Sequence, residues 1–147
     1  MGEKIQRDMV AAMKSKDNLR LDVLRGIKTA LKLKEVERGR GASDDEALQV
    51  LQSLAKQRKD SIEQFSKGGR QDLVEREQAE LAILESYLPA APSAQEIRAV
   101  VQEVIVELEA SSAKDLGKVM KLAMSRLSGK NVDGKVVNAE ARAQLGA

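Results

Sequence analysis

Apolar residues recur along most of this chain at spacings of three and four positions, and charged residues fill many of the positions between them. That period is typical of amphipathic α-helices that bury one face. The segment Val104-Ile105-Val106 is β-branched and favours a strand when taken alone, but it lies inside a helical series. We therefore predict seven helices and no strand, over residues 3–16, 17–38, 43–67, 71–87, 93–108, 113–127 and 133–145.

Both prolines of the chain fall in one short segment. Pro89 and Pro92 stand there, and proline stops helices and stiffens linkers. The predicted fold class is all-α: an N-terminal helical hairpin or bundle unit of four helices at residues 1–89, a linker at 89–92, and a small three-helix unit at 93–147. A unit as short as the last one is expected to be marginally stable alone.

Three single residues refine the predicted helices. Ser43 and Ser93 are each followed by a glutamate three positions later, which is the pattern of an N-terminal capping box. Gly117 stands inside a helical series, where glycine costs about 1 kcal/mol relative to alanine. It therefore indicates close approach either by a neighbouring helix or by a ligand, and the sequence favours neither.

The residues that the chain lacks exclude several kinds of active site. It has no histidine, cysteine or tryptophan, and only Phe65 and Tyr87 are aromatic. A Cys/His zinc site, a thiol nucleophile and a Ser-His-Asp triad are excluded, as is an RNA-binding surface built on base stacking. Glu103 and Glu107 share a helix face, but an ordinary solvated surface explains them better than a metal site. We predict no catalytic residue, no metal and no cofactor.

The expected location is the cytoplasm. The N-terminal segment is charged and amphipathic rather than shaped like a signal peptide, and no apolar run approaches the length that spans a bilayer. The absence of cysteine fits a reducing compartment. A soluble protein without a membrane partner is the expectation from these features.

The formal net charge of +2 averages regions of opposite sign. Residues 1–42 carry eleven basic and six acidic side chains, residues 43–92 carry six and ten, and residues 110–147 carry seven and three. Two interpretations of the basic C-terminal region stay open. It is either a phosphate-binding face, helped by backbone N–H groups at helix N-termini near Ser112 and Asp133, or a solvated helix surface. Six of its seven cations form the compact basic feature: Lys114, Lys118, Lys121, Arg126, Lys130 and Lys135.

Five segments resemble the YqeY family of small bacterial proteins. The resemblance covers nearly the whole chain. It implies similarity to the C-terminal region of the B subunit of the tRNA-dependent amidotransferase, a module also appended to some glutaminyl-tRNA synthetases. It therefore implies a bacterial protein with a two-part helical fold whose last three helices contact tRNA. The matching segments are residues 56–65, 69–74, 80–89, 114–120 and 133–138.

The resemblance also implies which residues would contact RNA. The lysines would bind phosphates, the glycines would permit close approach, and the asparagine would hydrogen-bond a ribose or a phosphate. The implied partners are tRNA and, beyond it, an aminoacyl-tRNA synthetase or an amidotransferase; no oligomeric state is implied. The resemblance implies Gly117, Lys118, Gly129, Lys130, Lys135 and Asn138, and the basic charge of the same region adds Lys114 and Lys121 as candidates.

Three functional hypotheses follow, and they belong to different classes. The first is a non-catalytic tRNA-binding accessory module that holds the RNA backbone and its shape through basic C-terminal helices. The second is a protein-interaction adaptor for a tRNA-handling enzyme. The third and least supported is a carbon–nitrogen ligase with glutamine as amido donor, because no residues resemble the catalytic machinery of such an enzyme.

Overall fold

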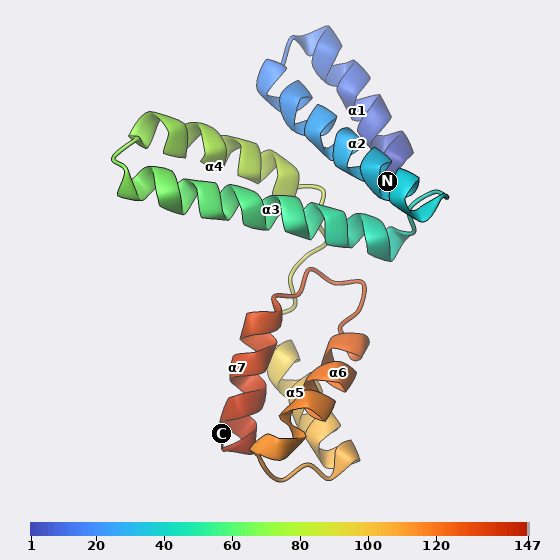
Figure 1. The fold of residues 1–147 in the computed structure, drawn as a ribbon, viewed down its shortest axis with the longest axis vertical. Helices are drawn as coiled ribbons and strands as arrows, with labels where there is room; N and C mark the ends of the chain where they lie inside the picture. The colour runs from blue at the N-terminus through green and yellow to red at the C-terminus, as the bar shows by residue number, and fades with distance from the viewer. Residues whose placement is uncertain (147) are drawn as a thin grey trace. The chain divides into compact units, whose positions relative to one another are not determined.

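The computed structural model describes residues 1–146. It contains seven α-helices, one short 3₁₀ turn and no strand in that range, which confirms the all-α prediction (Figure 1). The segment Val104-Ile105-Val106 is helical, as its surrounding periodicity predicts. The helices are α1 (Gly2–Ser15), α2 (Asn18–Arg38), α3 (Asp44–Lys67), α4 (Gln71–Glu85), α5 (Ala94–Leu108), α6 (Leu116–Arg126) and α7 (Gly134–Leu145), with the 3₁₀ turn η1 (Ala113–Asp115) directly before α6.

The two predicted capping boxes differ. At the start of α3 the box is complete, because Ser43 Oγ accepts from the Glu46 N–H at 3.2 Å and the Ser43 N–H donates to Glu46 Oε1 at 3.2 Å. At the start of α5 only half of it forms. Ser93 Oγ accepts from the Glu96 N–H at 3.1 Å, and the described residues show no return bond from the Ser93 N–H to the glutamate.

Met1–Leu88 form one compact unit. In it, α1 pairs with α2, and α3 pairs with α4 as an antiparallel hairpin, while α2 also contacts both helices of that hairpin (Figure 1). The core is aliphatic, and its largest fully buried side chains are Ile5, Val23, Leu24, Ile27, Leu51 and Leu84.

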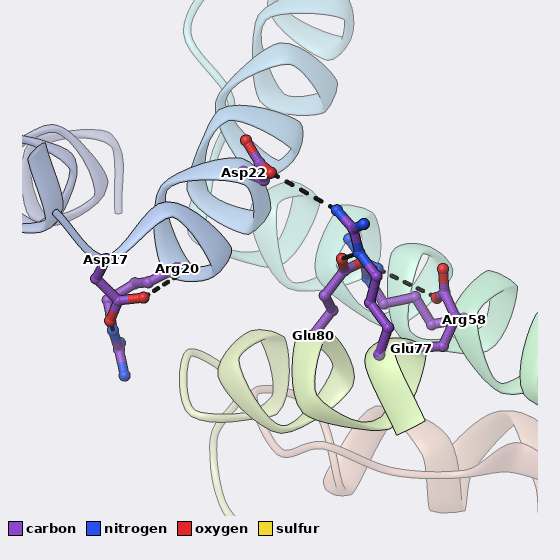
Figure 2. Close-up of polar contacts among 7 residues, drawn as sticks. Asp17, Arg20, Asp22, Arg58, Glu77 and Glu80 are labelled. Atoms are coloured by element: carbon purple, nitrogen blue, oxygen red, sulfur yellow. Dashed lines mark hydrogen bonds and ion pairs between the residues drawn. The ribbon is translucent and has the colours of Figure 1, made fainter. Parts of the chain in front are cut away.

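Charged side chains connect three helices of this unit. Glu80 of α4 is buried and pairs with Arg58 of α3, and Arg58 also lies 3.2 Å from Glu77 (Figure 2). Arg76 donates to Glu80 Oε1 at 3.0 Å and lies 3.9 Å from Asp22 of α2. Arg58 thus lies on the side of α3 that faces α4, and the carboxylates of Glu77 and Glu80 balance its charge.

The chain from Pro89 onward forms a second compact unit, made of α5, η1, α6 and α7. The three α-helices contact one another pairwise and enclose a separate apolar core. The buried residues of this core are Ile97, Val101, Val104, Val119, Ala123, Leu127, Val137 and Ala141.

Candidate nucleic-acid interface

All eight candidate residues lie in the C-terminal unit, but in two groups. Lys114 belongs to η1, directly before α6, whereas Lys118 and Lys121 are three positions apart on α6 and so lie on one side of that helix. Lys130 and Lys135 flank the turn from α6 to α7. Residues 118 to 127 span roughly 14 Å along a helix axis. The first three lysines therefore lie towards the start of α6, and the turn lysines lie beyond its other end.

Carboxylates of α5 neutralise part of the basic charge. Glu107 pairs with Arg126, and Glu96 pairs with Lys130. The remaining lysines are exposed and form no ion pair with any residue from 1 to 146. These unpaired cations are Lys114, Lys118, Lys121 and Lys135.

The backbone donors expected near Ser112 and Asp133 already have acceptors. The N–H groups of Ser111 and Ser112 donate to Asp115 Oδ2 at 3.0 and 3.4 Å. These two hydrogen bonds, together with the nearby charge of Lys118, lower the pKa of the Asp115 carboxyl. The Lys135 N–H donates to Asp133 Oδ1 at 2.9 Å. These backbone N–H groups are therefore not free to bind an anion, whereas the ammonium groups of the unpaired lysines are.

Gly117 faces open space. A Cβ atom added to it would meet no atom of the described residues within 4 Å, so close approach of a neighbouring helix does not explain this glycine. Gly129 differs, because its φ of +84° lies in the left-handed region that L side chains rarely adopt. Asn138 is half-buried, and its Oδ1 accepts from Arg142 Nε at 2.9 Å. The donors that Asn138 can offer to a ligand are its two amide N–H groups.

A hollow of about 210 Å³ lies in the N-terminal unit, where α1 and α3 begin beside α2. Its floor is apolar, with Ile5, Leu31 and Ala47, and its rim includes Lys28 and Lys32. Those two lysines belong to the basic first 42 residues, but the hollow contains none of the eight candidate residues. Sequence periodicity could not show it, because it is formed by helix ends rather than by a helix face.

Within residues 1–146, no three histidine, cysteine, aspartate or glutamate side chains are grouped so as to hold a metal ion. No helix of this range combines the length and the apolar character needed to cross a membrane.

Comparison with known proteins identifies relatives along the whole chain. The family model described as Yqey-like protein matches residues 2–145, which confirms the resemblance seen in the sequence. "Altered inheritance of mitochondria protein 41, mitochondrial" of Lachancea thermotolerans is 42% identical over 111 residues, covering 74% of this chain and 59% of the relative. The protein of that name from Pyrenophora tritici-repentis is 31% identical over 147 residues, covering 98% of this chain and 80% of the relative.

A third relative of the same name, from Kluyveromyces lactis, is 40% identical over 110 residues, covering 73% of this chain and 60% of the relative. The matched part of the chain thus spans about three fifths of the length of two of these relatives. None of these names states a catalytic activity.

These names correct the predicted setting. A bacterial, cytoplasmic protein was expected, whereas the matched relatives are named as mitochondrial proteins of fungi. The absence of cysteine and of long apolar runs does not distinguish the cytoplasm from other reducing aqueous compartments. The cytoplasmic location therefore did not follow from the composition.

Proposed function

This chain belongs to the Yqey-like protein family, and we propose that it is a non-catalytic accessory module that binds RNA, tRNA above all, through phosphate contacts. One observation carries the proposal. Lys114, Lys118 and Lys121 are exposed at and just before the start of α6 and have no ion-pair partner among the described residues, whereas α5 neutralises other cations of the unit. A phosphate can contact such lysines without first breaking an ion pair.

The composition of the C-terminal unit defines the mode of recognition. Both aromatic residues of the chain, Phe65 and Tyr87, precede this unit, so bases have no aromatic side chain of the unit on which to stack. Binding then depends on the position of phosphates and on the shape of an RNA helix rather than on base edges. The open surface over Gly117 lets an RNA backbone approach the start of α6.

The test is tRNA binding measured across a series of salt concentrations. The variant Lys114→Gln/Lys118→Gln/Lys121→Gln removes the unpaired lysines of the α6 start. The control Lys14→Gln/Lys56→Gln/Lys59→Gln removes three exposed lysines of the N-terminal unit that also lack an ion pair among residues 1–146. The two variants have the same net charge.

We expect the first variant to lower the slope of log affinity against log salt concentration by about three, or about one for each phosphate that no longer has a lysine to bind it. The control should keep the slope of the wild type. Equal losses in both variants would mean that overall charge, not this surface, governs binding. Affinity that is independent of salt would contradict phosphate recognition altogether.

A protein-interaction adaptor is the second candidate, and exposed apolar residues favour it. Leu33 and Val36 lie three positions apart on α2 and are 66% and 73% exposed. Such a pair fits contact with another protein, for which an aminoacyl-tRNA synthetase or an amidotransferase is the candidate partner. The variant Leu33→Ser/Val36→Ser should then abolish a complex that survives ribonuclease. A complex that ribonuclease dissolves would favour RNA binding instead.

A carbon–nitrogen ligase is the candidate with least support. We expect the purified chain to show no turnover that requires both ATP and glutamine. Turnover of that kind, retained in the lysine variant, would replace the RNA-binding proposal.

A further inference from the structure

Glu96 stands at the glutamate position of a capping box, but the structure shows it paired with a residue of another segment. In a capping box, the glutamate at the third helical position accepts from the N–H of the capping serine. Glu46 does this at the start of α3, where the Ser43 N–H donates to Oε1 at 3.2 Å. Glu96 occupies the same position in α5 but pairs with Lys130 across the unit.

Lys130 differs from the other candidate lysines in this pairing. It follows Gly129 in the turn between α6 and α7. Among the candidate lysines, and within residues 1–146, it is the one whose ammonium group pairs with a carboxylate. An RNA phosphate that approaches this turn must therefore compete with Glu96. The unpaired lysines at the start of α6 impose no such competition.

The exchange between these partners costs little. The side chains of Lys130 and Glu96 are 44% and 38% exposed, and an ion pair between exposed side chains contributes little to stability. A phosphate that binds Lys130 would take the place of Glu96. The Ser93 N–H, which the described residues leave without its capping-box acceptor, would then take the place of Lys130 beside Glu96.

We infer that Glu96 occupies the phosphate site of Lys130 in the RNA-free protein and that an RNA phosphate displaces it. The displaced carboxylate then completes the capping box at Ser93, so the start of α5 is better capped in the complex than in the free protein. Glu96 thereby weakens RNA binding at the α6–α7 turn. This inference rests on the proposed function.

The test compares tRNA affinities of three proteins at one low salt concentration: the wild type, Glu96→Gln and Glu103→Gln. Both substitutions remove one negative charge from α5, and Glu103 is exposed without an ion pair among the described residues. Glutamine also accepts the capping-box hydrogen bond, so α5 keeps its N-terminal pattern. We expect Glu96→Gln to tighten binding about threefold relative to Glu103→Gln, within the range that an exposed ion pair allows.

Two further measurements separate the possible outcomes. In a Lys130→Gln background the advantage of Glu96→Gln should vanish, because the pair is already broken. The amide proton of Ser93 should move downfield on RNA binding and also in Lys130→Gln without RNA. If the wild type binds tRNA but Glu96→Gln and Glu103→Gln bind it with equal affinity, the inference fails and the proposed function stands. If no protein binds tRNA in a salt-dependent way, both fail.

Discussion

At the scale of single residues, Tyr87 shows how a polar side chain is held in the N-terminal unit. The residue is 8% exposed, its hydroxyl donates to Asp8 Oδ2 at 2.5 Å, and Lys4 Nζ lies 5.2 Å from the centre of its ring. Burial, and after it the hydrogen bond to Asp8, raises the pKa of the Tyr87 hydroxyl to about 12 from its ordinary value of 10.0. Contacts with α1 thus secure the chain just beyond α4.

This shift predicts an alkaline titration that distinguishes folded from unfolded protein. Because the folded pKa is raised, the stability linked to the protonated hydroxyl is fully present below pH 10 and is lost as the pH rises towards 12. Tyrosinate absorbance should therefore titrate near 12 in the native protein and near 10 in urea. The variant Asp8→Asn should titrate between these values. Coincident native and urea curves would contradict the burial of Tyr87.

Gly117 carries a second prediction at this scale. Gly117→Ala should stabilise the protein by about 0.5–1 kcal/mol, because α6 gains helix propensity and the added methyl group meets no atom of the described residues. The same methyl group would occupy space that RNA is proposed to use, so tRNA affinity should fall. Gly26→Ala in α2 is the matched control, since its added methyl group is equally free.

Urea unfolding and tRNA binding measure the two effects of these glycine variants. Both substitutions should raise stability, and only Gly117→Ala should weaken binding. Unchanged affinity in Gly117→Ala would show that RNA does not approach this part of the helix.

At the scale of helices, the pairing of α3 with α4 depends on charge as well as on apolar packing. Glu80→Ala should destabilise the N-terminal unit by about 2 kcal/mol, because it leaves the half-buried Arg58 with only Glu77. Urea unfolding checks this value. Glu85→Ala, an exposed change on the same helix, should lie within about 0.5 kcal/mol of the wild type. If Glu80→Ala lowered the free energy of unfolding by no more than Glu85→Ala does, the ion pairs of Glu80 would contribute nothing to stability.

The helices themselves could be predicted because their signals are local. Apolar spacing, proline, and capping residues such as Ser43 lie within a few positions of the structure that they determine. Partners distant in sequence were not predictable. Glu96 and Lys130 are 34 positions apart, and periodicity shows that each faces outward without showing that they meet. The incomplete capping box at Ser93 escaped prediction for the same reason.

At the scale of the whole molecule, the two units have separate cores and should unfold in separable steps. Val119→Ala removes methyl groups from a fully buried site of the C-terminal unit, and Val23→Ala does the same in the N-terminal unit. Each substitution should lower the free energy of unfolding of its own unit by about 2 kcal/mol. Tyr87 fluorescence follows the N-terminal unit, and circular dichroism follows both.

In this test, Val119→Ala should shift part of the dichroism transition and leave the fluorescence transition unchanged. Val23→Ala should shift the fluorescence transition. A single transition displaced equally by both variants would show that the units unfold as one.

The basic C-terminal region could be located from charge counts, but its arrangement could not. A charge count treats every cation alike. In the folded protein, however, Glu96 of α5 pairs with Lys130, whereas Lys114 and Lys118 have no ion pair among the described residues. The sequence therefore predicted which unit carries the candidate interface. It did not predict that the candidates divide into two groups.

The scarcity of aromatic residues has a practical consequence for the purified protein. With one tyrosine and no tryptophan, the chain absorbs very little in the near ultraviolet, whereas nucleobases absorb strongly there. A small amount of RNA carried through purification would dominate the spectrum of the sample and inflate any protein concentration taken from it. The spectrum of the first purified fraction, before and after ribonuclease, is thus a direct assay for a natural nucleic-acid ligand.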